Sequence, residues 1–221
     1  MSTPQTFTYT STSTQEGDHS SPTDHFLIQR IVDSWAIWRD ARWWDRIEDL
    51  WHPEGRMVTT WGGLSSAAEF ARAAQSGYEA GDRMVHSNGG CTVDIVGNRA
   101  VSQTKLRIMQ RSVIDGVLCD SVCIGRDYDL LEYKDGRWGF LLRQPIYERD
   151  WITPVAPDAS LQVDPAVLSK YPQGYAHLGY IQSLLGYEIN LNLPTHDNAR
   201  LDELYHAGDT WLKTGVIEWE I

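Results

Sequence analysis

The chain has 221 residues, of which 42% are hydrophobic and 11% aromatic, and its formal net charge is −11. This apolar content is enough for the core of one ordinary domain with appendages, and it excludes a wholly disordered chain. The negative charge, with no run of Lys or Arg, excludes nucleic acid and an anionic membrane surface as partners, because both are bound through clustered basic residues.

The three cysteines, Cys91, Cys119 and Cys123, follow no CxxC pattern. Strand residues four positions apart lie about 13 Å from each other, too far for a disulfide, so we expect buried thiols and no zinc site. The chain also lacks an apolar signal core and any stretch that could span a bilayer. We therefore expect a cytoplasmic protein that holds no metal ion.

Residues 1–22 consist mainly of Ser, Thr, Gln and Gly, and we expect them to form a disordered tail. A helix should begin after Pro22, with Thr23 or Asp24 as its cap. Apolar residues then recur at intervals of three and four, which predicts one buried stripe along that helix.

Two further helices are predicted before the chain changes character. The first covers residues 43–51 and should end at a His-Pro turn, so we expect His52 to be a turn residue. The second should start at Ser65 or Ser66 and end near Gly81. With the first helix, they make three N-terminal helices.

Residues 91–151 alternate strand-like runs with turn dipeptides such as Asp115-Gly116 and Asp135-Gly136, a pattern typical of a meander of long antiparallel strands. The order of elements predicts an α+β domain over residues 23–151, in which three helices cover one face of a curved antiparallel sheet. Residues 152–221 form a C-terminal extension with helical patterns over residues 174–185 and 199–213. We expect it to be either a lid over the domain or an oligomerisation arm.

Several local strings, taken in order, resemble one superfamily. It comprises the SnoaL-like polyketide cyclases, scytalone dehydratase and hexachlorocyclohexane dehydrochlorinase, which share the cone-shaped fold of nuclear-transport-factor-like proteins. The resemblance runs from Ile28 to Trp151 and does not cover the extension. The strings are Trp35-Ala36-Ile37-Trp38-Arg39-Asp40, Trp44-Asp45, Leu50-Trp51-His52-Pro53, Met84-Val85-His86-Ser87-Asn88, Gly125-Arg126-Asp127-Tyr128-Asp129 and Asp135-Gly136-Arg137-Trp138, followed by Arg143.

The resemblance implies that Asp40 and His86 are catalytic. Asp40 would fix the tautomer of His86 through one ring nitrogen, and the other nitrogen would accept a proton. Arg143 matches a functional Arg on the last strand and would stabilise a leaving group or an enolate. The residues themselves leave rival interpretations open: Asp40 as a helix-end carboxylate, His86 as a polar edge residue, and Arg143 in a structural salt bridge.

We expect aromatic side chains to line the substrate pocket. Trp35, Trp44 and Trp61 come from the tryptophan-rich N-terminal region. Tyr147 shares the strand face of Arg143 and could donate a hydrogen bond. Tyr128 is a further candidate, although this motif usually has its aromatic residue one position earlier, where this chain has Asp127.

These features predict a cofactor-independent lyase or isomerase of the dehydratase, cyclase or dehydrohalogenase type, acting on a small apolar or aromatic molecule. The alternative is a non-catalytic ligand-binding or assembly subunit of the same fold, since fold alone does not decide function. We also expect a homodimer or homotrimer, because the N-terminal helices can cover only one of the two faces of the sheet.

Overall fold

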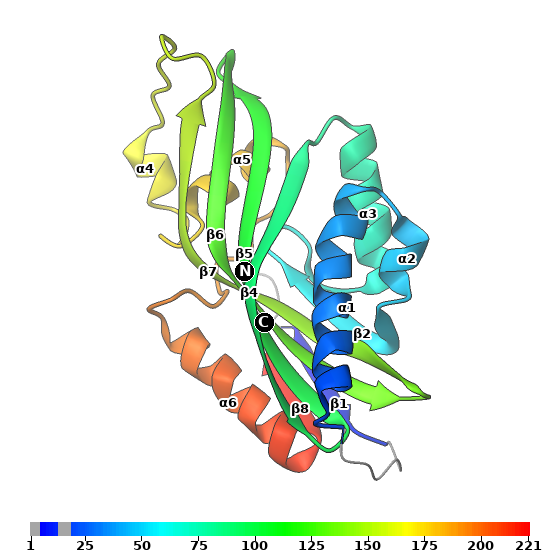
Figure 1. Cartoon of the computed structure of the whole chain (residues 1–221). Coiled ribbons are helices and arrows are strands. Elements are labelled where there is room, and N and C mark those ends of the chain that lie inside the picture. The colour runs from blue at the N-terminus through cyan, green and yellow to red at the C-terminus, as the bar shows by residue number, and fades with distance from the viewer. Residues whose placement is uncertain (1–4, 13–18) are drawn as a thin grey trace.

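Four long antiparallel strands form the centre of the molecule in a computed structural model that describes residues 5–12 and 19–221 (Figure 1). The expected Asp-Gly turns join them: Asp115, Gly116, Asp135 and Gly136 all have positive φ, as two-residue hairpins of the favoured twist require. The strands are β4 (Met84–Val96), β5 (Arg99–Ile114), β6 (Val117–Lys134) and β7 (Arg137–Pro154).

Two short strands, β2 (Trp51–Thr59) and β3 (Gly63–Ser66), complete a six-stranded sheet with the order β3-β2-β7-β6-β5-β4. The α+β cone with a curved antiparallel sheet is confirmed, with one correction: β2 pairs with β7 in parallel. A parallel pair needs a long crossover, and the chain between β2 and β7 supplies it. Register shifts at Ile124/Gly125 and Leu130/Leu131 are irregularities of the kind that bend long strands.

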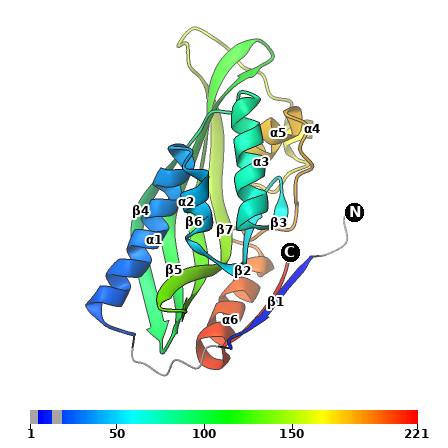
Figure 2. The same cartoon turned by 90° about the vertical axis from the view of Figure 1, so that its right-hand side faces the viewer.

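Three helices cover part of the inner, concave face of the sheet: α1 (Pro22–Asp40), α2 (Trp44–Glu48) and α3 (Ala67–Glu79) (Figure 2). The expected stripe of α1 is buried, and Ser66 caps α3 in a capping box. The cap expected for α1 is wrong: Ser21, not Thr23 or Asp24, accepts the backbone N–H bond that opens the helix. Asp24 is instead buried, where it accepts a hydrogen bond from the Trp138 indole.

His52 is not a turn residue. It lies on β2 and is buried, with its Nε2 2.9 Å from the carbonyl oxygen of Glu132. The Pro53 that suggested a turn occupies a place in β2 before its pairing with β7 becomes regular, between Trp51 and Arg56. A proline is tolerated there because it needs no ladder hydrogen bond.

The prediction of a disordered tail is wrong for the part of it that forms a strand. Residues Thr6–Thr10 form β1, which pairs with the C-terminal strand β8 (Val216–Glu220) as an antiparallel ribbon. The fully buried Glu132 carboxylate anchors the ribbon by accepting hydrogen bonds from Tyr9 and Ser11. Residues 1–4 and 13–18 of the predicted tail lie outside the described residues.

The C-terminal extension packs on both faces of the sheet. Its helices are α4 (Pro165–Leu168), α5 (Ala176–Leu184) and α6 (Ala199–Thr214). Trp211 of α6, completely buried, joins the β1–β8 ribbon on the outer face, and Leu178 of α5 packs with Tyr147 on the inner face. The extension therefore completes the apolar core on both faces of the sheet. Among the described residues, no helix has the length and apolarity needed to cross a membrane.

The outer face is bare near the β5–β6 hairpin, beyond the reach of α6 (Figure 1). Four exposed apolar side chains gather there, and we call them the hairpin patch: Val113 66% exposed, Leu118 44%, Trp151 39% and Val155 40%. Exposed apolar side chains that cluster in this way mark association surfaces more often than single ones do.

We predict that the protein is a homodimer or homotrimer and that Leu118→Glu shifts it toward the monomer, because the substitution places a charge within the hairpin patch. Light scattering after size-exclusion chromatography measures the mass of each form. Val96→Glu, at an equally exposed valine (48%) outside the patch, is the matched control and should leave the mass unchanged. A monomeric wild-type protein, or an unaltered mass for L118E, contradicts the prediction.

Candidate functional site

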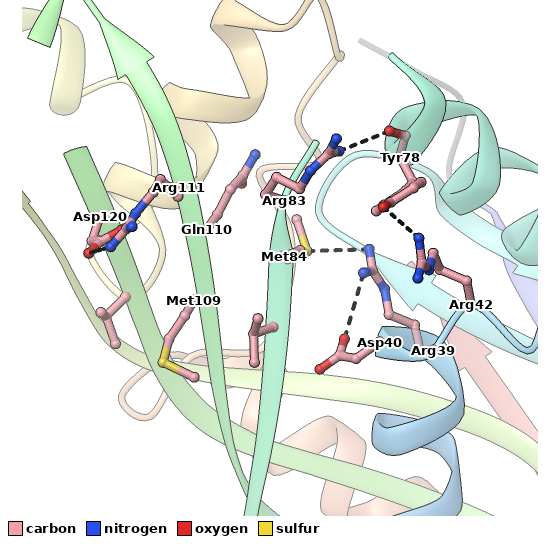
Figure 3. Close-up of a pocket in the computed structure, with 12 residues that line it drawn as sticks. Arg39, Asp40, Arg42, Tyr78, Arg83, Met84, Met109, Gln110, Arg111 and Asp120 are labelled. Carbon is pink, nitrogen blue, oxygen red and sulfur yellow. Dashed lines mark hydrogen bonds and ion pairs between the residues drawn. The ribbon is translucent and has the colours of Figure 1, made fainter. Parts of the chain in front are cut away.

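Asp40 and His86 are held together by two hydrogen bonds. Asp40 is the last residue of α1, and His86 lies on the edge strand β4. One oxygen of Asp40 lies 2.8 Å from His86 Nδ1, and the other accepts the His86 backbone N–H at 2.7 Å. The expected contact is thus present. Asp40 also lies 3.7 Å from its neighbour Arg39 (Figure 3).

The His86 imidazole is suited to accept a proton. Its side chain is only 6% exposed, and this burial lowers the pKa of His86 below the ordinary value, more than the Asp40 hydrogen bond raises it. The ring is therefore neutral at neutral pH. Because a carboxylate only accepts hydrogen bonds, the proton resides on Nδ1, and Nε2 carries the free lone pair.

His86 lines a small, partly open cavity of about 40 Å³ between the sheet, α1, α3 and α5. Three of the five expected aromatic residues, Trp35, Trp61 and Tyr147, are in its wall. Trp35 meets the His86 ring edge-to-face at 5.3 Å. Burial raises the pKa of Tyr147, so its hydroxyl stays protonated and can donate a hydrogen bond.

The other two expected aromatic residues lie elsewhere. Tyr128 points to the outer face, where its hydroxyl packs so closely on α6 that only a glycine fits at Gly208. Strand alternation explains this, since Asp127 on the inner face forces its neighbour outward. Trp44, the first residue of α2, is half-buried against the apolar core and does not line the cavity. The chain turns away after α1 through Arg42, whose φ is 63°.

Asp127 is a cavity residue that the sequence analysis passed over as a departure from the motif. It is 2% exposed, and burial raises its pKa to about 6 although the Arg143 charge opposes this. One of its oxygens has no hydrogen-bond partner among the described residues. The alternation of Asp127 and Asp129 around Tyr128 was the available signal, because it places two carboxyl groups on one strand face.

Arg143 forms a buried salt bridge, as the alternative to a catalytic role predicted. Its Nε and Nη2 reach the two oxygens of Asp129 at 2.7 and 3.0 Å, and Asp127 lies 3.5 Å away. The guanidinium is completely buried and stacks on the Trp35 ring at 4.6 Å, but it does not line the cavity. The charge of Arg143 thus acts on the cavity through Asp127 and Trp35.

No group of three or more His, Cys, Asp or Glu side chains within residues 5–12 and 19–221 could hold a metal ion. The cysteines are free, with Cys119 and Cys123 buried. The groups on the cavity wall include an imidazole, a carboxyl group with a raised pKa, a phenol, a guanidinium and indole rings.

The sequence and the fold of this chain are similar to those of known proteins. The SnoaL-like domain matches residues 23–144. "Pea pathogenicity protein 2" of Fusarium vanettenii is 31% identical over 212 residues, covering 91% of each chain, and an uncharacterized protein of Emericella nidulans is 30% identical over 84% of each. Hexachlorocyclohexane dehydrochlorinase LinA-type3 of Novosphingobium barchaimii shares the fold, with a TM-score of 0.50 and 15% identity over 64% of this chain and 96% of its own.

We predict that Asp129→Asn lowers the free energy of unfolding by about 3–5 kcal/mol, because it leaves the buried Arg143 charge without its bidentate partner. Urea denaturation followed by tryptophan fluorescence measures this change. Asp120→Asn is the control: Asp120 forms an equally bidentate pair with Arg111 in solvent, and such a pair contributes about 0–1 kcal/mol. Equal effects of the two variants would sink the prediction.

Proposed function

This chain belongs to the SnoaL-like domain family, a superfamily that includes dehydratases and cyclases, and from that premise we propose that it is a cofactor-independent lyase or isomerase. The substrate is a small apolar or aromatic molecule. The observation that carries the proposal is the doubly hydrogen-bonded Asp40–His86 pair, whose imidazole lines a small inner cavity.

His86 is the general base in this proposal. Its Nε2 takes a proton from a substrate carbon, and Asp40 holds the ring and stabilises the imidazolium that forms. The electron pair of the broken C–H bond makes a carbon–carbon double bond as the leaving group departs from the neighbouring carbon. In an isomerisation the proton returns to a different carbon instead.

Asp127 is the acid in this proposal, because it is the carboxyl group on the cavity wall and its raised pKa keeps part of it protonated. Its proton goes to a departing hydroxyl group, which leaves as water. The cycle closes when the His86 proton is passed back to Asp127. Arg143 opposes protonation of this acid, since its charge faces Asp127, and Asp129 offsets that charge through its salt bridge to Arg143.

Substrate entry requires the cavity to widen, because about 40 Å³ holds little more than water and ligand pockets measure about 300–1,000 Å³. We assign the movement to α5, which supplies Leu178 and Gln182 to the wall. Thr60 bonds to Gln182 and fastens this helix over β2. The extension is then the lid, and its closure excludes water from the proton transfer.

We predict that His86→Gln lowers turnover by about 10²–10⁴-fold, the usual contribution of a general base. A panel of aromatic and alicyclic alcohols, halides and ketones is incubated in D2O, and mass spectrometry follows loss of water, loss of hydrogen halide and deuterium uptake. Asp40→Asn should lose nearly as much, because an amide cannot accept both bonds. The control His206→Gln changes an exposed imidazole on α6 and should retain full activity.

The same panel tests the alternative of a non-catalytic binding protein. If H86Q and D40N bind or convert every compound as the wild-type protein does, His86 has no role as a base and the proposed enzymatic function is wrong. Binding without any conversion by the wild-type protein would favour the ligand-binding alternative.

We predict a bell-shaped pH profile of kcat/KM with a mildly acidic optimum. Activity falls on the acid side when His86 becomes protonated, and this limb lies below the ordinary imidazole value of about 6.5 because burial lowers the pKa of His86. Activity falls on the basic side as Asp127 loses its proton, at about 6. Asp127→Asn should lower kcat/KM to the level of the deprotonated form, because an amide cannot donate this proton, and should remove the basic limb. A basic limb that persists in D127N contradicts the role of Asp127.

A further inference from the structure

A groove of about 570 Å³ lies beside the Asp40–His86 pair, where β4 begins at the edge of the sheet (Figure 3). Arg39 and Asp40 at the end of α1, Arg83 and Met84 before and on β4, and Gln110 on β5 form part of its wall. Arg39 and Met84 also line the small inner cavity. The groove and the cavity therefore share a wall.

The groove carries positive charge in a chain whose net charge is −11. Four arginines and two aspartates line it. The arginine Arg111 is neutralised by Asp120, to which it makes two bonds of 2.7 Å. Arg42 and Arg83, by contrast, have no carboxylate within ion-pair distance in the described part of the chain. No direct ion pair thus neutralises these two cations, although the Asp82 carboxylate lies near enough to Arg83 to interact with it electrostatically.

Tyr78 holds these two cations in place. The Arg42 guanidinium lies 4.7 Å from its ring centroid and that of Arg83 lies 4.4 Å away. Arg42 donates to the Tyr78 hydroxyl at 2.6 Å, and Arg83 donates to the Tyr78 carbonyl oxygen at 3.0 Å. These contacts use one nitrogen of each guanidinium, so most of their N–H donors stay available. Orientation before binding lowers the entropic cost of holding a ligand.

Buried polar atoms in the same wall lack partners. Gln110 is 2% exposed, and neither its amide nitrogen nor its oxygen has a hydrogen bond among the described residues. Arg39 Nε is likewise unpaired, and its other nitrogens have only a sulfur contact with Met84 at 3.7 Å and Asp40 at 3.7 Å. Unpaired buried polar groups are costly to a folded protein and are rare without a purpose.

We propose that this groove binds an organic carboxylate, with Arg42 and Arg83 at its rim and Arg39 and Gln110 at its floor. The planar guanidinium fork matches a carboxylate, and a monoanion is preferred over a phosphate dianion because the Asp40 carboxylate lines the same groove. Val85, Met109 and Val122 give the groove an apolar side that suits a hydrocarbon body.

The groove is a binding site whether or not the cavity is catalytic. Its further interpretation, as the anchor that directs the body of a substrate past Arg39 and Met84 toward His86, rests on the proposed function. A substrate of this class carries one carboxylate on an apolar or aromatic frame.

The test compares two matched pairs of probes, 2-naphthoate with 2-naphthamide and benzoate with benzamide, by titration calorimetry at low salt. The wild-type protein should bind at least one carboxylate about tenfold or more tighter than its neutral amide. The double variant R42Q/R83Q should lose this preference and keep its affinity for the amide. Arg72→Gln, which removes an exposed arginine from α3 outside the groove, is the matched control and should behave as the wild type does.

Gln110→Met separates a binding role from a structural one. It replaces an unpaired buried amide with an apolar side chain of similar length, so it should raise the Tm of the free protein and weaken carboxylate binding severalfold. A lowered Tm with unchanged affinity would remove Gln110 from the site. Carboxylates that bind no better than their amides, or a preference that survives in R42Q/R83Q, would overturn the proposal.

H86Q keeps this result distinct from the proposed function. The variant should retain the carboxylate preference while it loses turnover. Turnover by the wild-type protein without a carboxylate preference would refute the carboxylate site and leave the proposed base His86 in place. A carboxylate preference without turnover would support the carboxylate site and refute the proposed enzymatic function.

Discussion

The completely buried guanidinium of Arg143 is the constraint around which the cavity is organised. A charge with no access to water must be neutralised at close range, and Asp129 does so through two hydrogen bonds across β6 and β7. The second carboxyl group, Asp127, interacts more weakly with Arg143, at 3.5 Å. Burial therefore outweighs the Arg143 charge and raises the pKa of Asp127 to about 6. The same positive charge adds to burial in lowering the pKa of His86. Burial thus leaves a carboxyl group with a raised pKa and a neutral imidazole in the same cavity, and the ion pair neutralises the charge beside them.

The long strands that hold this ion pair explain the C-terminal extension. β6 and β7 have 18 residues each, more than the three N-terminal helices can cover. α5 takes up the remaining inner face and closes the cavity, whereas α6 and the β1–β8 ribbon bury the outer face around Trp211 and Trp219. A segment that completes the core on both faces of the sheet is part of the fold, and its inner helix lies against the cavity. The hairpin patch is the outer surface that the extension does not reach.

The sequence predicted features whose causes are local. The Asp-Gly turns, the Ser66 cap and the stripe of α1 each depend on a few neighbouring residues, and the superfamily resemblance supplied the Asp40–His86 contact. Features with distant causes were missed. The β1 segment contains only Phe7 and Tyr9 as large apolar residues, and its partner strand lies at the opposite end of the chain. Tyr128 was assigned to the pocket because the motif was read one position out of phase, and Asp127 holds the inner position instead.

The end of α1 brings the charged groove and the Asp40–His86 pair together. Asp40 binds the backbone and the ring of His86, so it joins the helix end to the edge strand β4. Arg39, one residue earlier, lines both the groove and the cavity. The net charge of −11 repels anions at a distance, yet salt screens that field within about 8–10 Å, and Arg42 and Arg83, which have no direct ion pair, act at shorter range. An anion that reaches the groove therefore meets a locally positive surface one residue away from the carboxylate that binds His86.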